Sequence, residues 1–345
     1  MKRKRFLTTA VGLVCVLALL FGGCSQPAPE QPIELIMSTY YIPKYKFFFD
    51  PFLNFEERVE ERSNGRLEIL FFHSSQLFGS KAEFAALKTG QIDITQPPIQ
   101  KFSGIEPGFG IDAVPFLLTG DPRYDARLIE EVLAEQHYRP LYEKHGIELL
   151  ATALMGLPNQ VNSVDKEIRH PEDLNGLKVR ALGASISKML ELVGATPVVI
   201  SSSEQYTAYQ TGVIDAALSP YVSIALRNFY EVTDYVFELN VAPSINPLVM
   251  NKAKFDWLPS DLQEIIQEAA DEFVEDYLSL VSEEKAKYKK IAQMKGMNIY
   301  SPTQEELRPW REKIEPVTDW WLEQYPEGQK VLDAVAAWKK ANPLK

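Results

Sequence analysis

The sequence predicts an α/β fold of two lobes, and three observations support this prediction. The chain has 345 residues, which is more than one ordinary domain needs. Apolar runs of strand length alternate with segments of helical periodicity, and this alternation starts near residue 33 and again after residue 146. One helix-and-strand unit of the first half also returns in the second half.

That repeated unit is an amphipathic helix, a Thr-Gly stop and a strand that opens with Ile-Asp. It reads "SKAEFAALKTGQIDITQPP" and later "SEQYTAYQTGVIDAALSP". A serine is the expected N-cap of each helix. Gly90 and Gly212 stand just after the helices, where glycine most easily supplies a positive φ. Asp93 and Asp215 open the strands. The matching context favours two similar lobes over a chance match.

The remaining elements follow from periodicity and turn signals. The first half is expected to contain a strand over 33–41, a helix over 44–64, a strand over 66–72, a helix over 80–88 and a short strand over 92–96. The second half is expected to contain strands over 147–154, 177–181, 196–200 and 213–219, with helices over 185–194 and 203–210. From about residue 252 the sequence is helical, and 259–296 is either one helix of more than 30 residues or two helices in succession.

The N-terminus predicts export. "MKRKR" is followed by an uncharged apolar run and then by "LFGGC", which is similar to a bacterial lipobox. We expect residues 1–23 to be a signal peptide, Cys24 to be lipidated and residues 24–32 to form a tether. An ordinary signal peptide with a nearby cleavage site, or an uncleaved anchor, are the alternatives. Cleavage removes four basic residues and no acidic one, and changes the net charge from −11 to −15.

Composition and motifs favour binding without catalysis. The negative net charge argues against a nucleic acid partner. No G-x-S-x-G, H-E-x-x-H, Walker or dinucleotide-binding motif occurs. The only cysteines are Cys15 and Cys24, so the exported part has neither a disulfide nor a cysteine metal site. The four histidines lack metal-ligand spacing. We therefore expect no cofactor, no metal and no enzymatic activity.

One arginine stands in an unusual place. In "DLNGLKVRALG", residues 173–183, the apolar run from Leu177 to Val179 ends in Arg180 and is followed by small residues. Ligands of α/β folds bind at the carboxyl ends of parallel strands, and a guanidinium offers two parallel donors to a carboxylate. The alternative is a structural ion pair with a nearby acid such as Asp173.

An ordered set of segments resembles the solute-binding proteins of tripartite ATP-independent periplasmic (TRAP) transporters, the DctP family. The segments are "NGRLEILFFHSSQLFGSKAEFAALKTGQIDI", "VPFLL", "HPEDLNGLKVRA", "GATPVVISSSEQYTAYQTGVIDAALSP", "NFYEVTDYV" and "LPSDLQEIIQEAA". They occur in the order of the family and cover essentially the whole mature chain. Each segment alone is a weak signal, whereas the ordered set after a lipoprotein-like start is a specific one.

The resemblance implies a periplasmic-binding-protein-like fold of two α/β lobes, with a long helix that spans both and a ligand in the cleft between them. The expected lobes are 33–150 plus about 241–275, and 151–240 plus about 276–345 with the C-terminal helices. The resemblance also implies that Arg180 forms a salt bridge with a ligand carboxylate.

Several positions depart from the pattern of the family. "LPNQVN" has no arginine where many members have one, and "LSP" replaces "ENP". We therefore expect one anchoring charge and a monocarboxylate ligand. The expected ligand-binding residues are Arg180, Gln96, Asn159, Ser202, Tyr206, Ser219, Tyr221 and Tyr40.

The resulting prediction is an extracytoplasmic protein that captures an organic acid and delivers it to the small and large membrane subunits of a TRAP transporter. Its expected location is the periplasm or the outer face of the cell membrane, to which the N-terminal lipid would attach it. Two alternatives remain open at this point: a binding protein of an ABC importer or a sensor, and an exported enzyme on a two-lobed scaffold.

Overall fold

A computed structural model of the chain describes residues 31–80, 82–154, 158–243 and 245–344. The predicted signal peptide, Cys24 and nearly all of the predicted tether lie outside the described residues. Residues Pro32–Lys345 form one compact unit.

The first lobe is built on a five-stranded sheet with the order β2-β1-β3-β10-β4. Its strands are β1 (Ile33–Ser38), β2 (Leu67–Phe72), β3 (Ile94–Thr95), β4 (Ile147–Leu154) and β10 (Ile245–Asn251). The helices between these strands are α1 (Lys46–Arg62), α2 (Glu83–Lys88), η1 (Ile99–Phe102), η2 (Pro107–Ala113), α3 (Pro122–Leu128), the π-helix η3 (Ile129–Tyr138) and α4 (Arg139–Glu143).

The second lobe is built on a six-stranded sheet with the order β11-β9-β5-β8-β6-β7. Its strands are β5 (Asn159–Ser163), β6 (Lys178–Ala181), β7 (Thr196–Val199), β8 (Ala216–Ser219), β9 (Tyr235–Val241) and β11 (Asn298–Tyr300). Its helices are η4 (Pro171–Leu174), α5 (Ala184–Leu192), α6 (Gln205–Gln210), α7 (Tyr221–Leu226) and η5 (Phe229–Glu231). The chain ends in α8 (Lys252–Trp257), α9 (Ser260–Met294), α10 (Arg308–Ile314), α11 (Val317–Gln324) and α12 (Gly328–Ala341).

Each sheet is parallel except for one strand. In the first sheet β10 runs antiparallel to both β3 and β4, and in the second β5 runs antiparallel to both β8 and β9. Each of these two strands directly follows a strand of the other sheet, because β5 comes after β4 and β10 comes after β9, whereas the third passage, through α8 and α9, leads to β11, which runs parallel to β9. The predicted two-lobed α/β fold is confirmed, and the sheets exchange strands at these two passages.

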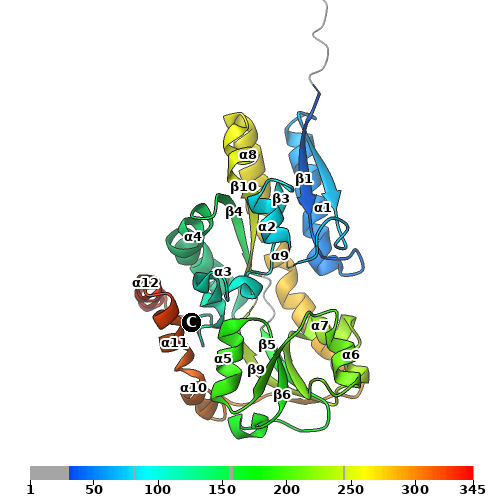
Figure 1. Ribbon diagram of the computed structural model, residues 1–345, viewed down its shortest axis with the longest axis vertical. Helices are drawn as coiled ribbons and strands as arrows, with labels where there is room; N and C mark the ends of the chain where they lie inside the picture. Colours follow the sequence, from blue (N-terminus) through cyan, green and yellow to red (C-terminus); the bar gives the residue numbers. More distant parts are fainter. Residues whose placement is uncertain (1–30, 81, 155–157, 244, 345) are drawn as a thin grey trace, which may run out of the picture. The chain divides into compact units, whose positions relative to one another are not determined.

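The segment for which one or two helices were predicted is the single 35-residue helix α9. It packs against α1 and β4 of the first lobe and against α7 of the second, and Figure 1 shows it running past both sheets. On the α1 side the contact is partly ionic, since Arg58 donates to both oxygens of Asp276, at 2.7 and 3.0 Å. The predicted long helix that spans both lobes is therefore confirmed.

The repeated unit makes the same contact in both lobes. The Asp93 backbone N–H donates to Ile36 O and its carboxylate accepts from Ile36 N–H, both at 2.8 Å. Asp215 makes the same two bonds with Lys178, also at 2.8 Å. Gly90 and Gly212 have φ values of +70° and +65°, as predicted.

The prediction of serine N-caps was wrong. Helix α2 begins at Glu83 with Ala82 as its N-cap, and α6 begins at Gln205 with Glu204 as its N-cap. The hydroxyl of Ser80 accepts instead from Lys101, at 2.8 Å. The hydroxyl of Ser203 lies 2.8 Å from that of Ser201.

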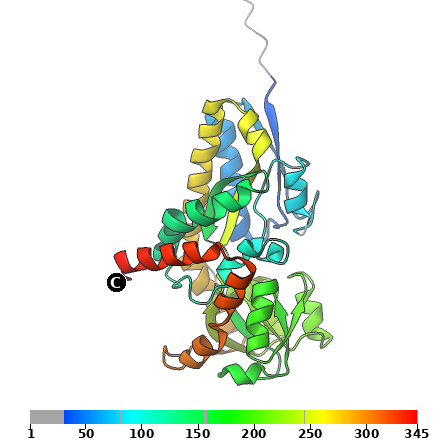
Figure 2. The same ribbon diagram turned by 60° about the vertical axis from the view of Figure 1, so that its left-hand side comes forward.

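The C-terminal helices cover apolar surface. Trp310 and Trp321 are both 1% exposed, and the indole N–H of Trp321 donates to Pro107 O at 2.8 Å. Helix α12 packs against the π-helix η3, and Figure 2 shows it in red, just below the blue-green helix of the first lobe and above the bright green helices of the second. Its Val331 and Val335 belong to the apolar core of the first lobe.

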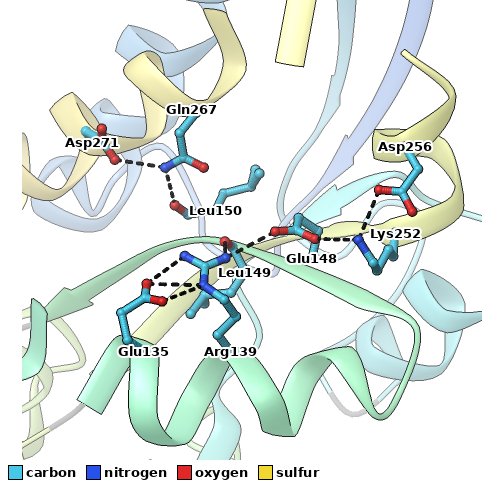
Figure 3. Close-up of polar contacts among 9 residues, drawn as sticks. All are labelled: Glu135, Arg139, Glu148, Leu149, Leu150, Lys252, Asp256, Gln267 and Asp271. Carbon is cyan, nitrogen blue, oxygen red and sulfur yellow. Dashed lines mark hydrogen bonds and ion pairs between the residues drawn. The ribbon is translucent and has the colours of Figure 1, made fainter. Parts of the chain in front are cut away.

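A chain of polar contacts holds β4 between its neighbours (Figure 3). Arg139 donates to the Glu148 carboxylate and to Leu149 O, each at 3.1 Å. Lys252 of α8 bonds the second oxygen of Glu148 at 3.0 Å. Gln267 of α9 donates to Leu150 O at 2.7 Å. The strand that leads toward the second lobe is thus fixed from three helices.

Within the described ranges, no helix is both long enough and apolar enough to cross a membrane.

Candidate functional site

A cavity of about 400 Å³ lies between the two lobes, within the usual size range of small-molecule sites. The first lobe contributes Tyr40, Tyr41, Ile42, Tyr45, Phe48, Ser74, Ser75, Gly79, Ser80, Pro98, Lys101 and Asn246 to its lining. The second lobe contributes Asn159, Arg180, Leu182, Ser201, Ser202, Ser203, Pro220, Val222, Ser223, Leu226 and Arg227. No aspartate or glutamate stands among these described lining residues.

Arg180 lies at the carboxyl edge of three parallel strands. It is in β6, which pairs in parallel with β7 and β8. Its guanidinium lies 3.4 Å from Ile200 O, directly after β7, and 3.4 Å from Leu218 O, in the last but one residue of β8. The same guanidinium donates to Ser202 Oγ at 3.0 Å. The sheet therefore places this cation where α/β folds bind ligands.

Arg180 is buried without an anionic partner. It is 2% exposed, and no ion pair joins it to a carboxylate of the described chain. Asp173, the proposed structural partner, uses its carboxylate to accept from the backbone N–H groups of Arg169 and His170. Burial lowers the pKa of Arg180 to about 10; Tyr209 opposes this shift, and the charge of Arg227 adds to it. An anion in the cavity would relieve both effects.

The expectation of one anchoring charge was incomplete. Arg227, just after α7, and Lys101, at the end of η1, line the same cavity. Arg227 lies 5.4 Å from the ring centre of Tyr45, and Lys101 lies 5.5 Å from that of Tyr40. The lining thus carries three cationic side chains in a chain whose formal net charge is −11. This local field attracts an anion.

One wall of the cavity is aromatic. Tyr40 and Tyr41 have ring centres 4.2 Å apart, and Tyr41 stacks on Phe48 with centres 5.1 Å apart and planes 9° from parallel. Burial raises the pKa of Tyr41 to about 12, so its hydroxyl is neutral at physiological pH. This wall offers apolar faces and neutral hydroxyl groups beside the cations.

Four of the eight residues expected to bind ligand line this cavity: Arg180, Asn159, Ser202 and Tyr40. Arg180 and Ser202 contact each other directly. Asn159 is the first residue of β5 and is 2% exposed. The structure thus brings together, from four separate stretches of sequence, half of the predicted set.

The other four are not among the lining residues. Ser219 accepts from Gln205 at 2.8 Å, and Tyr221 donates to Glu238 at 3.0 Å. Tyr206 donates to Glu231 at 2.8 Å. Gln96 is fully buried and donates to Asn246 O at 3.0 Å. Direct ligand contact by these four remains a prediction.

Sequence reasoning missed Arg227, Lys101 and Asn246. Lys101 follows "QPP" at the end of a strand, which is a position that could have indicated it. Asn246 and Arg227 carry no such signal, because their place at the cavity depends on how β10 and α7 meet the rest of the fold.

Within the described residues, no group of three His, Cys, Asp or Glu side chains is placed to hold a metal ion.

Comparison with known proteins gives the family. Residues 40–324 match the family model DctP, described as bacterial extracellular solute-binding protein, family 7. The chain is 27% identical to the C4-dicarboxylate-binding periplasmic protein DctP of Rhodobacter capsulatus, over 98% of this chain and 99% of that protein. It is also 27% identical to the 2,3-diketo-L-gulonate-binding periplasmic protein YiaO of Escherichia coli, over 81% of this chain and 85% of that protein.

A solved structure with the same fold is a TRAP periplasmic solute-binding protein of Roseobacter denitrificans with bound β-D-glucuronate. It superposes with a TM-score of 0.81 at 18% identity and covers 88% of this chain and 99% of that one. The members of the matched family are solute-binding proteins and not enzymes, in agreement with the binding role predicted from the sequence. The match to the family model covers well over half of the chain. The chain therefore belongs to family 7 of the bacterial extracellular solute-binding proteins, the DctP family.

Proposed function

We propose that this protein captures an organic acid outside the cytoplasmic membrane and delivers it to the small and large membrane subunits of a TRAP transporter. The family is extracellular, and relatives named for organic acids support the ligand class. The structural neighbour from Roseobacter denitrificans, a TRAP protein, supports the transporter type.

One observation carries the proposal. The guanidinium of Arg180 is buried at the carboxyl edge of β6, faces no carboxylate of the described chain, and lines the cavity between the lobes. A buried cation without a counterion is costly unless a ligand supplies the charge. A carboxylate matches the fork of a guanidinium. The two further cations at the cavity leave open whether the acid has one carboxylate or two, so both kinds belong in the test.

The test is titration calorimetry of the mature chain with a panel of mono- and dicarboxylates, repeated with Arg180→Ala. Loss of a buried charged partner costs about 2–5 kcal/mol, which weakens binding roughly 30-fold to several thousand-fold. Arg169→Ala is the matched control, because Arg169 is an exposed arginine of the same lobe and does not line the cavity. An Arg180→Ala protein that binds the best acid within about threefold of wild type would contradict the anchoring role.

The proposal also includes the way in which the protein is attached to the membrane. We propose that the mature chain starts at an acylated Cys24 and that residues 24–32 tether the folded unit to the membrane. The basic n-region, the apolar run and the Gly-Gly-Cys ending support this. A fatty-acid analogue should label the wild-type protein in cells and leave Cys24→Ala unlabelled. Equal labelling of the two proteins would rule out acylation at Cys24.

A further inference from the structure

Two asparagines at the cavity have amide oxygens without a hydrogen-bond partner. Asn159 is 2% exposed and Asn246 is 3% exposed. The Oδ1 atoms of both are buried and accept no hydrogen bond from the described protein atoms. Both residues line the cavity. Buried polar atoms are nearly always hydrogen-bonded, so an unpaired acceptor beside a ligand site calls for a donor on the ligand.

The orientation of the Asn159 amide follows from its other contact. Its Nδ2 donates to Ala242 O at 2.6 Å, and a carbonyl oxygen can only accept. The free atom of Asn159 is therefore the oxygen. The Nδ2 of Asn246 lies 3.0 Å from the Tyr41 hydroxyl, and Gln96 holds the Asn246 backbone carbonyl. The bond to Ala242 O thus fixes the orientation of the Asn159 amide, and the contact with the Tyr41 hydroxyl, which can donate or accept, holds the Asn246 amide within its own lobe.

The two amides occupy equivalent places in the fold. Asn159 opens β5 and Asn246 is the second residue of β10, and these are the two antiparallel strands that enter a sheet from the other lobe. One acceptor therefore stands at each of the two passages that lead directly from a strand of one lobe to a strand of the other. Asn159 shares its sheet with Arg180, two strands away in the order β5-β8-β6.

We infer that the ligand is a carboxylate that also carries O–H or N–H groups, and that these groups donate to Asn159 Oδ1 and Asn246 Oδ1 while the carboxylate binds Arg180. This inference rests on the proposed function and narrows it to hydroxy acids and to acids with an amine or lactam N–H. Plain alkyl or aryl acids leave both acceptors unpaired. Because the two acceptors belong to different lobes, a ligand that reaches both also joins the lobes.

The experiment compares acids that differ in their donors. The mature chain is titrated with L-lactate and propionate, L-mandelate and phenylacetate, L-pyroglutamate and cyclopentanecarboxylate, and D-glucuronate and cyclohexanecarboxylate. In the pair that binds best, we expect the donor-bearing acid to bind at least about 30-fold more tightly. A site built to hydrogen-bond a polar group strongly rejects the analogue that lacks it.

The side chains are tested with substitutions of similar size. Asn159→Leu should reduce the preference within that pair to below about threefold, through weaker binding of the donor-bearing acid. Asn162→Leu is the matched control. Asn162 lies on the same strand, is buried and also has an unpaired Oδ1, but its Nδ2 donates to Tyr209 and it does not line the cavity. It should keep the wild-type preference even if it lowers the melting temperature.

The outcomes separate this inference from the proposed function. If neither these acids nor the mono- and dicarboxylates of the first titration bind, both are overturned. If acids bind and Arg180→Ala abolishes binding, but donor-bearing and plain acids bind equally well, the proposed function stands and this inference is overturned. The comparison on the wild-type chain needs no substitution, so it decides the matter even if Asn159→Leu fails to fold.

Discussion

At Arg180 the geometry of the charge matters as much as its sign. The guanidinium has one close partner, Ser202, while its contacts with Ile200 O and Leu218 O are long, at 3.4 Å. A carboxylate could therefore use two parallel N–H groups without displacing a strong internal bond. Lysine keeps the charge but presents a single compact ammonium on a different stem.

Arg180→Lys should consequently recover little of the binding that Arg180→Ala loses. We expect the affinity for the best acid of the panel to fall at least about tenfold, or about 1.4 kcal/mol, while the melting temperature of the unliganded protein stays close to wild type. Calorimetry together with thermal melts checks both expectations. Wild-type affinity in Arg180→Lys would mean that charge alone is recognised.

Glu83 predicts a pH dependence of stability. It is the first residue of α2 and is 0% exposed, and burial raises the pKa of its carboxyl from 4.5 to about 8, although the charge of Lys101 opposes this. The folded chain thus holds a proton that the unfolded chain releases above pH 4.5. The folded state therefore binds more protons than the unfolded state in this range. The contribution of Glu83 to the free energy of unfolding falls as the pH rises from about 4.5 to about 8.

Glu83→Gln removes this titration while keeping the shape of the side chain. We expect the variant to gain stability relative to wild type at pH 8 and to show a smaller gain, or none, at pH 5. Urea denaturation at the two pH values measures the difference. Glu61→Gln, an exposed residue of α1, is the control and should show no such change. A Glu83→Gln gain that is equal at both pH values would contradict the buried, protonated carboxyl.

Some site residues could be predicted from sequence because their place depends on local structure. Arg180 ends a short apolar strand beside small residues, and this pattern alone puts it at a sheet edge. Asn246 and Arg227 reach the cavity only through the packing of distant elements. Ser219 and Tyr221 were expected at the cavity from the resemblance to the family, and in the structure their hydroxyl groups bond to Gln205 and Glu238. Sequence pattern does not indicate which way such side chains turn.

At the scale of elements, the two aspartates of the repeated unit make equal contacts in unequal surroundings. Asp93 is 9% exposed, whereas the side chain of Asp215 is 38% exposed. Asp93 accepts a hydrogen bond from the backbone N–H of Ile36 in β1, and Asp215 accepts one from the backbone N–H of Lys178 in β6. Loss of an acceptor leaves a buried donor unsatisfied at a cost of about 1–3 kcal/mol, and water can replace it where the site is exposed.

Asp93→Ala should therefore lower the free energy of unfolding by more than Asp215→Ala does. We expect a loss of about 1–3 kcal/mol for Asp93→Ala and less than about 1 kcal/mol for Asp215→Ala. Denaturant titration of both variants gives the comparison. Asp93→Asn, which keeps an acceptor oxygen, should recover most of the loss. Equal losses at the two positions would show that burial does not set the cost.

Periodicity predicted most elements of the fold but not their ends or their pairing. The helix expected over 44–64 is α1, Lys46–Arg62, and its repeated phenylalanines are largely in the core. Phe48 is an exception, since it lines the cavity. The π-helix η3 and the single antiparallel strand in each sheet were not predicted. The strands β5 and β10 each directly follow a strand of the other sheet, and no residue pattern in the sequence records those two crossovers.

At the scale of the whole molecule, the two lobes also meet away from the cavity. Ser103 of the first lobe accepts from the backbone N–H of Ala184, at the start of α5 in the second, at 3.3 Å. Beside this contact, a Cβ on Gly110 would lie 2.3 Å from Ser185 Oγ and 3.4 Å from Trp321. The close approach of η2 to α5 thus needs a residue without a side chain at position 110.

This contact gives a prediction about lobe closure. A ligand that binds the closed form more tightly than an open form shifts the population toward closure. If the contact between η2 and α5 belongs to the closed form, Gly110→Val should disfavour that form without changing any residue that lines the cavity. The variant should bind the best acid of the panel at least about tenfold more weakly than wild type, although its cavity side chains are intact.

Small-angle scattering of the mature chain, with and without a saturating concentration of that acid, tests the prediction. The radius of gyration of wild type should decrease on binding, and that of Gly110→Val should decrease less or not at all. Gly104→Val is the matched control, because a Cβ at Gly104 meets no atom within 4 Å in the same loop region. It should close like wild type. If Gly110→Val closes and binds as Gly104→Val does, the contact between η2 and α5 is not part of the closing movement, and ligand contacts alone must hold the lobes together.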